Sequence, residues 1–346
     1  MTVDRKLRIA VVGCGAFGRN HARVYRQLKD QIGNVELVGV VDTNAERSAA
    51  LAQEFGTQAL LSVGQLQNKI DAASVTVPTI DHLKVARQLM EAGVDVLIEK
   101  PIAVSLAEAD ELIAVAHRTG RIAQAGHLER FNPAVLATLP LVTQPMFFEV
   151  HRLSVFTPRS LDVDVVMDLM IHDLDVVLSL VKAPVREIRA VGLPVISDKV
   201  DIANVRIEFD TGCVANFTAS RVSTEKVRKL RFFQPHQYIS IDYGRQDVIS
   251  IRVDERAAAA LLRGDVPTAA LGPAPGIAVE KPKVESREPL RTEIEEFLAA
   301  VRTRGAPAVS LQDGRQALAL ALDINGAIQA HHRRAGLGKS SDWVTR

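Results

Sequence analysis

Short apolar runs alternate with amphipathic stretches through the first part of the chain. The runs are Leu7–Val12, Val35–Val41, Ala73–Val77 and Val94–Ile98. The stretches that follow them have helical periodicity over Gly18–Leu28, Ala45–Phe55, His82–Ala92 and Leu106–Arg118. Strands that are apolar throughout need helices on both faces, and strands alternating with helices of this length form parallel sheets. The pattern predicts a doubly wound α/β domain of the Rossmann type over residues 1–126.

The periodicity changes after Gly126. One apolar helix is predicted over Asp164–Leu180, and the residues after it alternate in polarity as strands do. Asn204–Phe209 and Cys213–Ala219 flank Asp-Thr-Gly, a pattern typical of a β-hairpin. Further strands are predicted over Arg231–Phe233, Tyr238–Asp242 and Val248–Val253, a proline-rich loop over Arg263–Ser286, and helices over Leu290–Arg302 and Asp313–His331. We therefore expect residues 127–346 to form an α+β domain with an open, mostly antiparallel sheet.

Composition and charge narrow the functional classes. The 346 residues contain 42 Lys and Arg against 41 Asp and Glu, and a net charge of +1 argues against binding nucleic acid or a membrane by bulk electrostatics. Apolar residues make up 47% of the chain, as in a globular protein, yet no apolar run is long enough to span a membrane. The first residues, MTVDRKL, lack the apolar core of a signal peptide. Two cysteines, Cys14 and Cys213, cannot form a disulfide framework, so we expect a reducing, cytoplasmic location.

Residues 13–18, Gly-Cys-Gly-Ala-Phe-Gly, form a GxGxxG motif between the first predicted strand and the first predicted helix. Gly13 permits a tight turn, Gly15 lets a pyrophosphate approach the backbone, and Gly18 lets the helix pack closely on the sheet. Asp42 ends the second strand, 24 residues after Gly18, where a carboxylate accepts from ribose hydroxyls and repels a 2′-phosphate. The alternative is a glycine turn with a surface aspartate. The agreement of motif, strand, helix and acid predicts a site for NAD rather than NADP.

Other polar residues follow the predicted strands, at the carboxyl edge where open α/β sheets bind ligands. Val77 ends the third strand, Pro78 follows it, and His82 opens the next helix, unless His82 is simply a solvated first-turn residue. Lys100 follows the fourth strand in Glu-Lys-Pro. A lysine against apolar walls can have a lowered pKa and can hydrogen-bond or deprotonate a hydroxyl, although a surface lysine is the ordinary alternative. We expect cofactor contacts from Gly13, Gly15, Ala16, Phe17, Gly18, Asp42, Thr43, Val77, Pro78, His82, Glu99 and Lys100.

Asp168 and His172 lie four residues apart in the predicted helix, which places them on one face. A carboxylate that orients an imidazole is a common arrangement for a general base. The alternative is a buried histidine with a polar neighbour, since the segment is otherwise strongly apolar. Asp173 and Asp175 are expected on the opposite, wetter face.

The glycine turn, Val-Thr-Val-Pro, Glu-Lys-Pro and the Asp-x-x-x-His helix together resemble the Gfo/Idh/MocA family of NAD(P)-dependent sugar and polyol dehydrogenases, over essentially the whole chain. The resemblance implies that Lys100 contacts the reacting hydroxyl, that His172 is the candidate base and that Asp168 is its orienting partner. It also implies that the last helix packs back towards the Rossmann domain and that the open sheet makes a homo-oligomer, a dimer or tetramer. Lys100 and His172 come from different domains, so we expect the site in the cleft between them. No metal site is expected.

Residues 126–133, Gly-His-Leu-Glu-Arg-Phe-Asn-Pro, follow the last predicted strand of the Rossmann domain and enter a helix at Pro133. Arg130 and Asn132 can donate to sugar hydroxyls, an acetamido group or a phosphate, and Asn132 can also cap the helix. This segment and DLMIHDLDVVLSL are similar to the family's branch that oxidises UDP-N-acetylglucosamine at C3 to a 3-keto nucleotide sugar for lipid A synthesis. The resemblance thus implies substrate contacts from Lys100, Arg130, Asn132 and His172.

A local basic cluster is the one feature of the sequence that suits a sugar nucleotide, because Arg and Lys bind diphosphates by charge-assisted hydrogen bonds. It consists of Arg221, Lys226, Arg228, Lys229 and Arg231, with Arg152 and Arg159 as further candidates. The alternative is a solvated edge strand whose charges discourage pairing.

Other functions remain open at this point. Inositol, a free hexose and another UDP-sugar are alternative substrates. An NAD-binding regulatory protein without catalysis is a different class, but it needs none of Lys100, Asp168 and His172. A biliverdin-type or dihydrodiol reductase predicts a more aromatic pocket than a chain with 4% aromatic residues offers.

Overall fold

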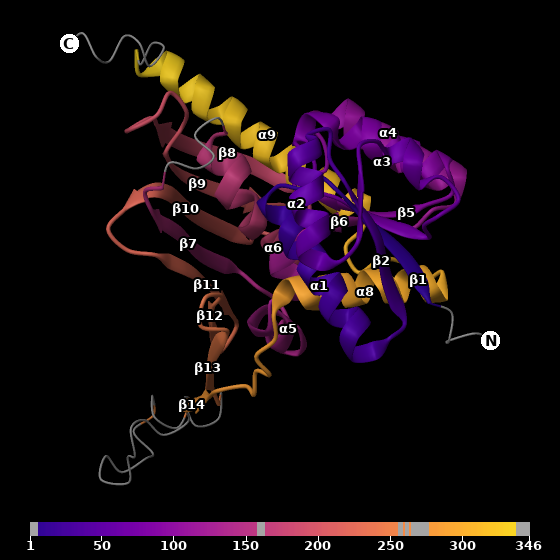
Figure 1. Ribbon diagram of the computed structural model, residues 1–346. Coiled ribbons are helices and arrows are strands. Elements are labelled where there is room, and N and C mark those ends of the chain that lie inside the picture. The colour runs from indigo at the N-terminus through magenta and orange to yellow at the C-terminus, as the bar shows by residue number, and fades with distance from the viewer. Residues whose placement is uncertain (1–5, 158–162, 255–258, 260–262, 264–276, 337–346) are drawn as a thin grey trace. The chain divides into compact units, whose positions relative to one another are not determined.

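The computed structural model of the chain divides into two compact units (Figure 1). Unit 1 comprises Met1–Phe131 and Glu288–Ala319, and unit 2 comprises Asn132–Arg287 and Leu320–Arg346. The structure describes residues 6–157, 163–254, 259, 263 and 277–336. Each unit is built on one sheet.

Unit 1 contains a six-stranded parallel sheet in the order β3-β2-β1-β4-β5-β6. The strands are β1 (Leu7–Val12), β2 (Val35–Val41), β3 (Gln58–Leu60), β4 (Ala72–Val75), β5 (Asp95–Glu99) and β6 (Ala123–Gly126). The order reverses between the neighbours β1 and β4, which leaves the switch point of a doubly wound sheet at their carboxyl ends. The predicted Rossmann architecture is confirmed.

Helices follow most strands of unit 1, and a late segment of the chain joins them. They are α1 (Ala16–Ile32), α2 (Ala45–Phe55), α3 (His82–Glu91), α4 (Leu106–Thr119), α8 (Pro289–Thr303) and the start of α9 (Leu311–Arg334), with 3₁₀ turns η1 (Val63–Leu66), η2 (Thr79–Asp81) and η3 (Leu128–Phe131). Helix α1 packs against α2 and α8, while α3 packs against α4 (Figure 1). Ile9 of β1, Leu28 of α1 and Phe297 of α8 are buried in one apolar core, so α1 and α8 together cover this part of the sheet.

Unit 2 contains an eight-stranded sheet in the order β14-β13-β12-β11-β7-β10-β9-β8. The strands are β7 (Phe147–Val155), β8 (Val185–Leu193), β9 (Ile202–Phe209), β10 (Val214–Ser223), β11 (Val227–Gln234), β12 (Gln237–Asp242), β13 (Asp247–Val253) and β14 (Ile277–Glu280). All neighbours are antiparallel except β7 and β10, which run parallel. The predicted open, mostly antiparallel sheet is confirmed, including the β9–β10 hairpin, whose Gly212 has φ +79°.

Three parts of unit 2 differ from the sequence-based prediction. Strands β7 and β8 were not predicted, and β14 lies inside the stretch expected to be a loop. Residues 264–276 of that stretch are outside the described residues. The other elements are α5 (Pro133–Thr138), η4 (Leu139–Leu141), the π-helical turn η5 (Val166–Met170), α6 (Ile171–Val181) and the end of α9.

The expectation that Asp173 and Asp175 lie on a wetter face is wrong. Both carboxylates are buried, at 1% and 2% exposure. The cause for Asp173 is a partner distant in sequence, because Arg152 on β7 donates to its carboxylate from 2.6 Å and 2.9 Å. A buried charge is tolerated when it is paired and hydrogen-bonded in this way.

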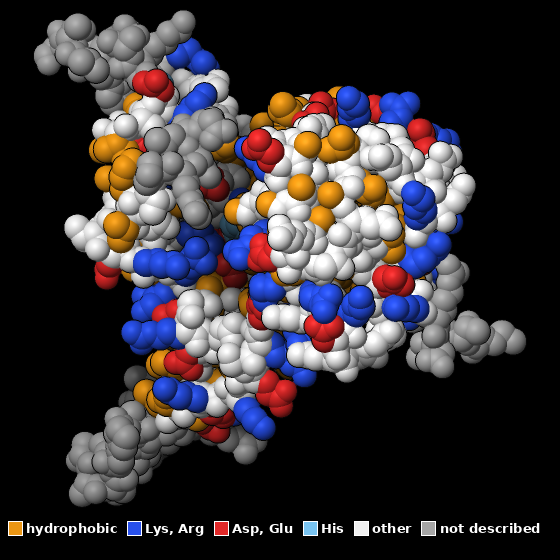
Figure 2. Space-filling model, viewed as in Figure 1, with side chains coloured by type: hydrophobic (Ala, Val, Ile, Leu, Met, Phe, Trp, Pro, Cys, Tyr) orange, Lys and Arg blue, Asp and Glu red, His pale blue; other side chains and the backbone are white. Residues whose placement is uncertain are grey.

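The surface of unit 1 agrees with the even charge balance. Acidic and basic side chains are interspersed over its visible face, with no large area of one sign (Figure 2). Among the helices that the structure describes, none combines the length and the apolar character needed to cross a membrane.

Candidate active site

The glycine turn lies between β1 and α1 and is shaped by the absence of side chains. Gly13 has φ +104°, and a Cβ there would lie 2.6 Å from the backbone of Thr76. A Cβ on Gly18 would lie 1.8 Å from the carbonyl oxygen of Gly13, so the helix and the turn touch directly. A Cβ on Gly15, by contrast, would meet nothing within 4 Å. The backbone at Gly15 is therefore open to a ligand, as a pyrophosphate site requires.

The N-terminus of α1 favours an anion. No side chain caps it, and its first turn contains no acidic residue, so no carboxylate of that turn offsets its free N–H groups and its positive dipole end. Ala16 and Phe17, expected at the cofactor, are exposed in this first turn, and Phe17 has 57% exposure.

Asp42 stands at the carboxyl end of β2, beside the glycine turn. Its carboxylate accepts from the backbone N–H of Cys14 at 2.8 Å and of Asn44 at 2.8 Å. These bonds fix its position between the turn and the start of α2, with Thr43 exposed next to it. A fixed carboxylate at this edge suits ribose hydroxyls, which can donate to its remaining lone pairs.

His82 is buried rather than solvated, so the solvated alternative is wrong. Its Nε2 lies 2.9 Å from the carbonyl oxygen of Val77 and its Nδ1 lies 2.9 Å from that of Pro101. Burial lowers the pKa of His82 although both carbonyls oppose the effect, so a neutral ring donates to one carbonyl at a time. The imidazole therefore connects the loops that follow β4 and β5. Pro78, which lies in the first of these loops, is exposed.

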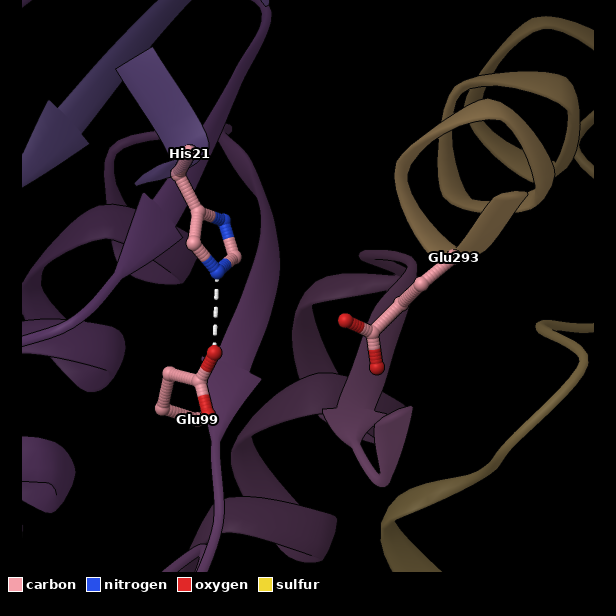
Figure 3. Close-up of side chains that lie close together, drawn as sticks. All are labelled: His21, Glu99 and Glu293. Atoms are coloured by element: carbon pink, nitrogen blue, oxygen red, sulfur yellow. Dashed lines mark hydrogen bonds and ion pairs between the residues drawn. The ribbon is translucent and has the colours of Figure 1, made fainter. Parts of the chain in front are cut away.

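Glu99 ends β5 and Lys100 follows it, and the peptide bond from Lys100 to Pro101 is cis. Glu99 accepts from Nε2 of His21 at 2.8 Å (Figure 3) and from the backbone N–H of Lys100 at 3.3 Å. Burial alone would raise the pKa of Glu99, but the hydrogen bond from His21, together with Lys100, holds this pKa below its ordinary value. Glu99 is therefore an anion that receives hydrogen bonds on both oxygens.

In unit 1 the structure brings most of the expected cofactor residues to one edge. Gly13 follows β1, Asp42 follows β2, Val77 follows β4 and Lys100 follows β5, and these are neighbouring parallel strands. Their carboxyl ends meet at the same edge of the sheet, where an open α/β sheet binds its ligands.

Asp168 and His172 lie in unit 2. Asp168 is in the π-helical turn η5, His172 is in the first turn of α6, and both are half-buried. The side chain of Asp164 starts this segment by accepting from the N–H groups of Val166 and Met167 at 2.9 Å and 3.0 Å. The helical segment is confirmed, whereas the shared cleft of His172 with Lys100 stays a prediction.

Asn132 has the structural role that the sequence analysis set beside a substrate contact, because it caps a helix. Its side-chain oxygen caps α5 by accepting from the N–H of Ala134 at 3.1 Å, and its side-chain nitrogen donates to the carbonyl of Tyr243 at 3.1 Å. At 3% exposure it is fixed within unit 2. Arg130, in η3 of unit 1, is half-buried, and its role at the substrate stays a prediction.

The basic cluster is divided between buried and accessible cations. Arg221 has 5% exposure, lies 3.6 Å from the carboxylate of Asp201 and donates to the carbonyl of Val163. Arg152 is held by Asp173, so neither of these two arginines remains a candidate for a diphosphate. Lys226 is exposed, while Arg228, Lys229 and Arg231 are half-buried. Arg159 lies outside the described residues.

Sequence reasoning missed the polar side chains behind Glu99. His21 and Tyr25 on α1 and Ser74 on β4 are all at 0% exposure. One pattern could have identified His21: it lies next to Ala22 and four residues before Tyr25, on the face of α1 that also buries Leu28. A polar residue on the apolar face of a helix needs a buried partner.

Comparison with known sequences gives two family matches. The family described as "Oxidoreductase family, NAD-binding Rossmann fold" matches residues 7–127, and the GFO/IDH/MocA C-terminal domain matches residues 145–236. The UDP-N-acetylglucosamine 3-dehydrogenase of Acidithiobacillus ferrooxidans is 38% identical over 329 residues, which are 95% of this chain and 99% of that protein. The scyllo-inositol 2-dehydrogenase (NAD(+)) of Bacillus subtilis is 27% identical over 239 residues, 64% of this chain and 69% of that protein.

Solved structures agree with the sequence matches. A structure of the Acidithiobacillus ferrooxidans UDP-N-acetylglucosamine 3-dehydrogenase matches with a TM-score of 0.84 at 36% identity, covering 94% of this chain and 98% of that one. A putative myo-inositol dehydrogenase from Sinorhizobium meliloti matches with a TM-score of 0.75 at 20% identity, over 94% of this chain and 98% of that one, which supports the fold alone.

Proposed function

Because the chain belongs to the Gfo/Idh/MocA family of oxidoreductases acting on CH–OH groups, we propose that it oxidises C3 of UDP-N-acetylglucosamine with NAD⁺ to the 3-keto nucleotide sugar. The observation that carries the proposal is the near full-length similarity to a UDP-N-acetylglucosamine 3-dehydrogenase. It spans both the unit with the cofactor motif and the unit with the Asp168–His172 helix. A fragment match to the Rossmann domain alone would carry no information about the sugar.

The residues at the edge of the unit 1 sheet fit NAD. The open backbone at Gly15 and the uncapped start of α1 suit its pyrophosphate, and Asp42 suits a ribose diol. A 2′-phosphate beside the Asp42 carboxylate would be repelled, which is why we propose NAD rather than NADP. When bound, NAD⁺ supplies a nicotinamide ring whose C4 accepts a hydride.

The reaction removes a hydride from the carbinol carbon and a proton from its hydroxyl. In the proposal, Lys100 hydrogen-bonds the reacting oxygen and stabilises the negative charge that develops on it. His172 takes the hydroxyl proton, and Asp168 orients its imidazole and stabilises the imidazolium. We also propose polar contacts to the nucleotide sugar from Arg130 and from the accessible cations of the basic cluster.

A substrate panel tests the proposal. Purified protein is given NAD⁺ with UDP-N-acetylglucosamine, UDP-glucose, glucose or myo-inositol, and NADH formation is followed by absorbance. Reduction of the product with borodeuteride, followed by NMR, shows which carbon became the ketone. We expect turnover only with UDP-N-acetylglucosamine and deuterium at C3; turnover with inositol and none with the UDP-sugar would overturn the proposal.

Two alanine variants test the catalytic residues. Lys100→Ala and His172→Ala should each lower kcat by about 10²- to 10⁴-fold, the usual contribution of a general acid or base. The matched controls are Lys84→Ala and His117→Ala, because both of these side chains are exposed on helices of unit 1 and neither is among the expected cofactor or substrate contacts. Full turnover by either active-site variant, with NADH binding unchanged, would exclude that residue from the chemistry.

Polyol oxidation is the second candidate, and the similarity to inositol dehydrogenases favours it. The panel separates the two directly. The wider setting is also part of the proposal: a 3-keto sugar is a substrate for amination, and lipid A synthesis uses such an amino sugar. A homo-oligomer in the cytoplasm completes this picture, and light scattering of the purified protein tests the oligomer.

A further inference from the structure

A row of buried polar side chains runs from α1 to the end of β5 inside unit 1. The hydroxyl of Tyr25 lies 2.8 Å from Oγ of Ser74, which lies 2.9 Å from Nδ1 of His21. Nε2 of His21 lies 2.8 Å from Oε1 of Glu99 (Figure 3). Oε2 of Glu99 accepts from the backbone N–H of Lys100 at 3.3 Å. The row therefore ends at the peptide group that carries the proposed catalytic lysine.

The chemistry of the groups gives this row one direction. An ionised Glu99 can only accept, so Nε2 of His21 carries the hydrogen, and Nδ1 of the neutral ring accepts from Ser74. Burial raises the pKa of Tyr25, which keeps its hydroxyl hydrogen available to donate to Ser74. In this arrangement every hydrogen in the row has one acceptor. In an imidazolium, Nδ1 of His21 would also donate, so Ser74 would donate to Tyr25 instead of accepting from it. The hydroxyl hydrogen of Tyr25 would then need a further acceptor.

The Glu99 carboxylate is held from two sides, and this determines the geometry at Lys100. One oxygen is bound by the imidazole and the other by the Lys100 N–H, so the carboxylate cannot turn without breaking a hydrogen bond. Strand β6 lies directly beside Glu99 in the sheet, where Gly126 is its register partner, and a Cβ on Gly126 would lie 3.0 Å from Cα of Glu99. The peptide plane before Lys100, and hence the direction in which its side chain leaves the strand, depends on these contacts.

We propose that His21, a residue outside the expected substrate and cofactor contacts, positions Lys100 through the Glu99 carboxylate and so controls the rate of the chemical step. This inference rests on the proposed function, because the position of Lys100 matters only if it acts at the hydroxyl. Helix α1 would then have two roles. Its N-terminus faces the expected pyrophosphate site, and His21, about one turn later, holds the loop of Lys100 through Glu99.

The charges around Glu99 make the imidazole necessary. Besides His21 and Lys100, the titratable groups that face it are Glu293 on α8 and His82 on α3. Glu293 is fully buried, and atoms of His21, Glu99 and Glu293 lie within 4.8 Å of one another (Figure 3). A nearby carboxylate disfavours a second negative charge. Without a donor at position 21, Glu99 takes up a proton at a higher pH and loses its hold on Lys100.

Two substitutions separate positioning from simple packing. In His21→Leu both polar ring atoms are lost, whereas in His21→Gln the side-chain amide can still donate to Glu99. We expect His21→Leu to lower kcat by about 10- to 100-fold, as small displacements of a reacting group do, with KM for NAD⁺ changed by less than about threefold. The acid limb of kcat should move to higher pH by about one unit or more. His21→Gln should restore most of kcat and the original limb.

A destabilised control distinguishes this from general damage to α1. Leu28→Ala removes buried contacts from the same helix and changes none of the polar side chains of the row. It should lower the melting temperature and leave the pH profile of kcat unchanged. Equal losses in His21→Leu and His21→Gln, or a His21→Leu profile identical to that of the wild type, would overturn the inference.

The same three side chains could instead hold a metal ion, and elemental analysis decides between the two. A zinc or other divalent ion present in the purified wild-type protein at one per chain would overturn the inference, because the contact between His21 and Glu99 would then be mediated by the ion. If the wild type turns over no UDP-N-acetylglucosamine, the proposed function fails, and NADH binding then tests the row. Under the inference, the affinity of His21→Leu for NADH depends on pH in the acid range, whereas the affinities of the wild type and of His21→Gln do not. A pH-independent affinity in His21→Leu overturns the inference.

Discussion

The guanidinium of Arg152 and the carboxylate of Asp173 form a buried two-point ion pair that joins β7 to α6. The two bonds measure 2.6 Å and 2.9 Å, and the side chains are 3% and 1% exposed. Asp173 follows His172 directly in sequence, so the pair also fixes the helical turn that carries the candidate base. Arg152 lies over the ring of Tyr243 as well, 5.2 Å from its centroid.

Removing one member of this pair should destabilise unit 2 strongly. Asp173→Ala removes the carboxylate that receives two hydrogen bonds from the buried guanidinium, and the expected loss is about 3–5 kcal/mol in the free energy of unfolding. The double variant Arg152→Met with Asp173→Leu should recover much of it, because both charges are gone. Urea unfolding measures both. The control, Arg189→Met, affects an exposed pair with Glu187 and should leave the midpoint unchanged.

The stability contributed by Glu99 should depend on pH in the acid range. Burial opposes ionisation, but His21 and Lys100 outweigh it and hold the pKa of Glu99 below its ordinary value of 4.5. A carboxyl with a lowered pKa stabilises the fold fully above the ordinary value and progressively less as the pH falls through the lowered one. The difference in unfolding free energy between wild type and Glu99→Gln should therefore shrink between about pH 6 and about pH 3.

A double-variant cycle identifies the source of this effect. In the His21→Leu background, the difference in unfolding free energy made by Glu99→Gln should lose most of its pH dependence in that window. A dependence of equal size in both backgrounds would show that the imidazole is not responsible.

Alanine should have different effects at two positions of the glycine turn: at Gly18 it should impair folding, and at Gly15 it should impair cofactor binding. Gly18→Ala places a Cβ 1.8 Å from the Gly13 carbonyl and should lower the melting temperature. Gly15→Ala meets no protein atom within 4 Å and should fold normally, yet weaken NADH binding by about tenfold or more, since the methyl group occupies the approach of the pyrophosphate. Thermal unfolding and NADH fluorescence measure the two effects. Gly326→Ala, which also meets no atom within 4 Å, serves as the binding control.

Replacing Asp42 should reduce the discrimination between the two nicotinamide cofactors. Asp42→Ser removes the negative charge and shortens the side chain, so a 2′-phosphate is no longer repelled. We expect the ratio of kcat/KM for NAD⁺ to that for NADP⁺ to fall by about 10-fold or more, equivalent to roughly 1.4 kcal/mol. Steady-state kinetics with both cofactors gives the ratio, and an unchanged ratio would remove Asp42 from cofactor selection.

Neither cysteine should react readily at neutral pH. Burial, with a smaller effect from Asp42, raises the pKa of the Cys14 thiol to about 12, and burial raises the pKa of Cys213 to about 11. The thiolate is the reactive form, so labelling of the native protein by Ellman's reagent should be slow for both. Two thiols should react once the protein is unfolded in guanidinium. Rapid labelling of Cys14 in the folded state would contradict the raised pKa of its thiol.

Local patterns predicted unit 1 better than unit 2. The glycine turn, the apolar strands and the helices between them are neighbours in sequence, and the periods of their side chains identify them. Strand β7 was missed because its sequence, FFEVHRLSV, alternates around His151 and Arg152, which resemble surface residues until their partners are known. Its parallel pairing with β10 joins residues far apart in sequence, and no local pattern encodes that contact.

The same limit applies to the candidate site. Lys100 and Asp42 were predicted because each ends an apolar strand. Asp173 was misassigned because its burial depends on Arg152, and the role of His21 was missed because it depends on Ser74 and Glu99, which lie on two other elements. Buried polar contacts between distant elements carry the information that single-sequence patterns lack.

The assembly of unit 1 from two separate segments affects how the protein is made. The core beneath α1 includes Ile294, Phe297 and Val301 of α8, which leave the ribosome only after the described strands of both sheets. A nascent chain that ends at residue 131 thus exposes apolar surface that α8 covers later, and so does any fragment expressed as a stand-alone Rossmann domain. The core of unit 1 thus stays incomplete until α8 is synthesised, and a chaperone can protect the exposed apolar surface during that time.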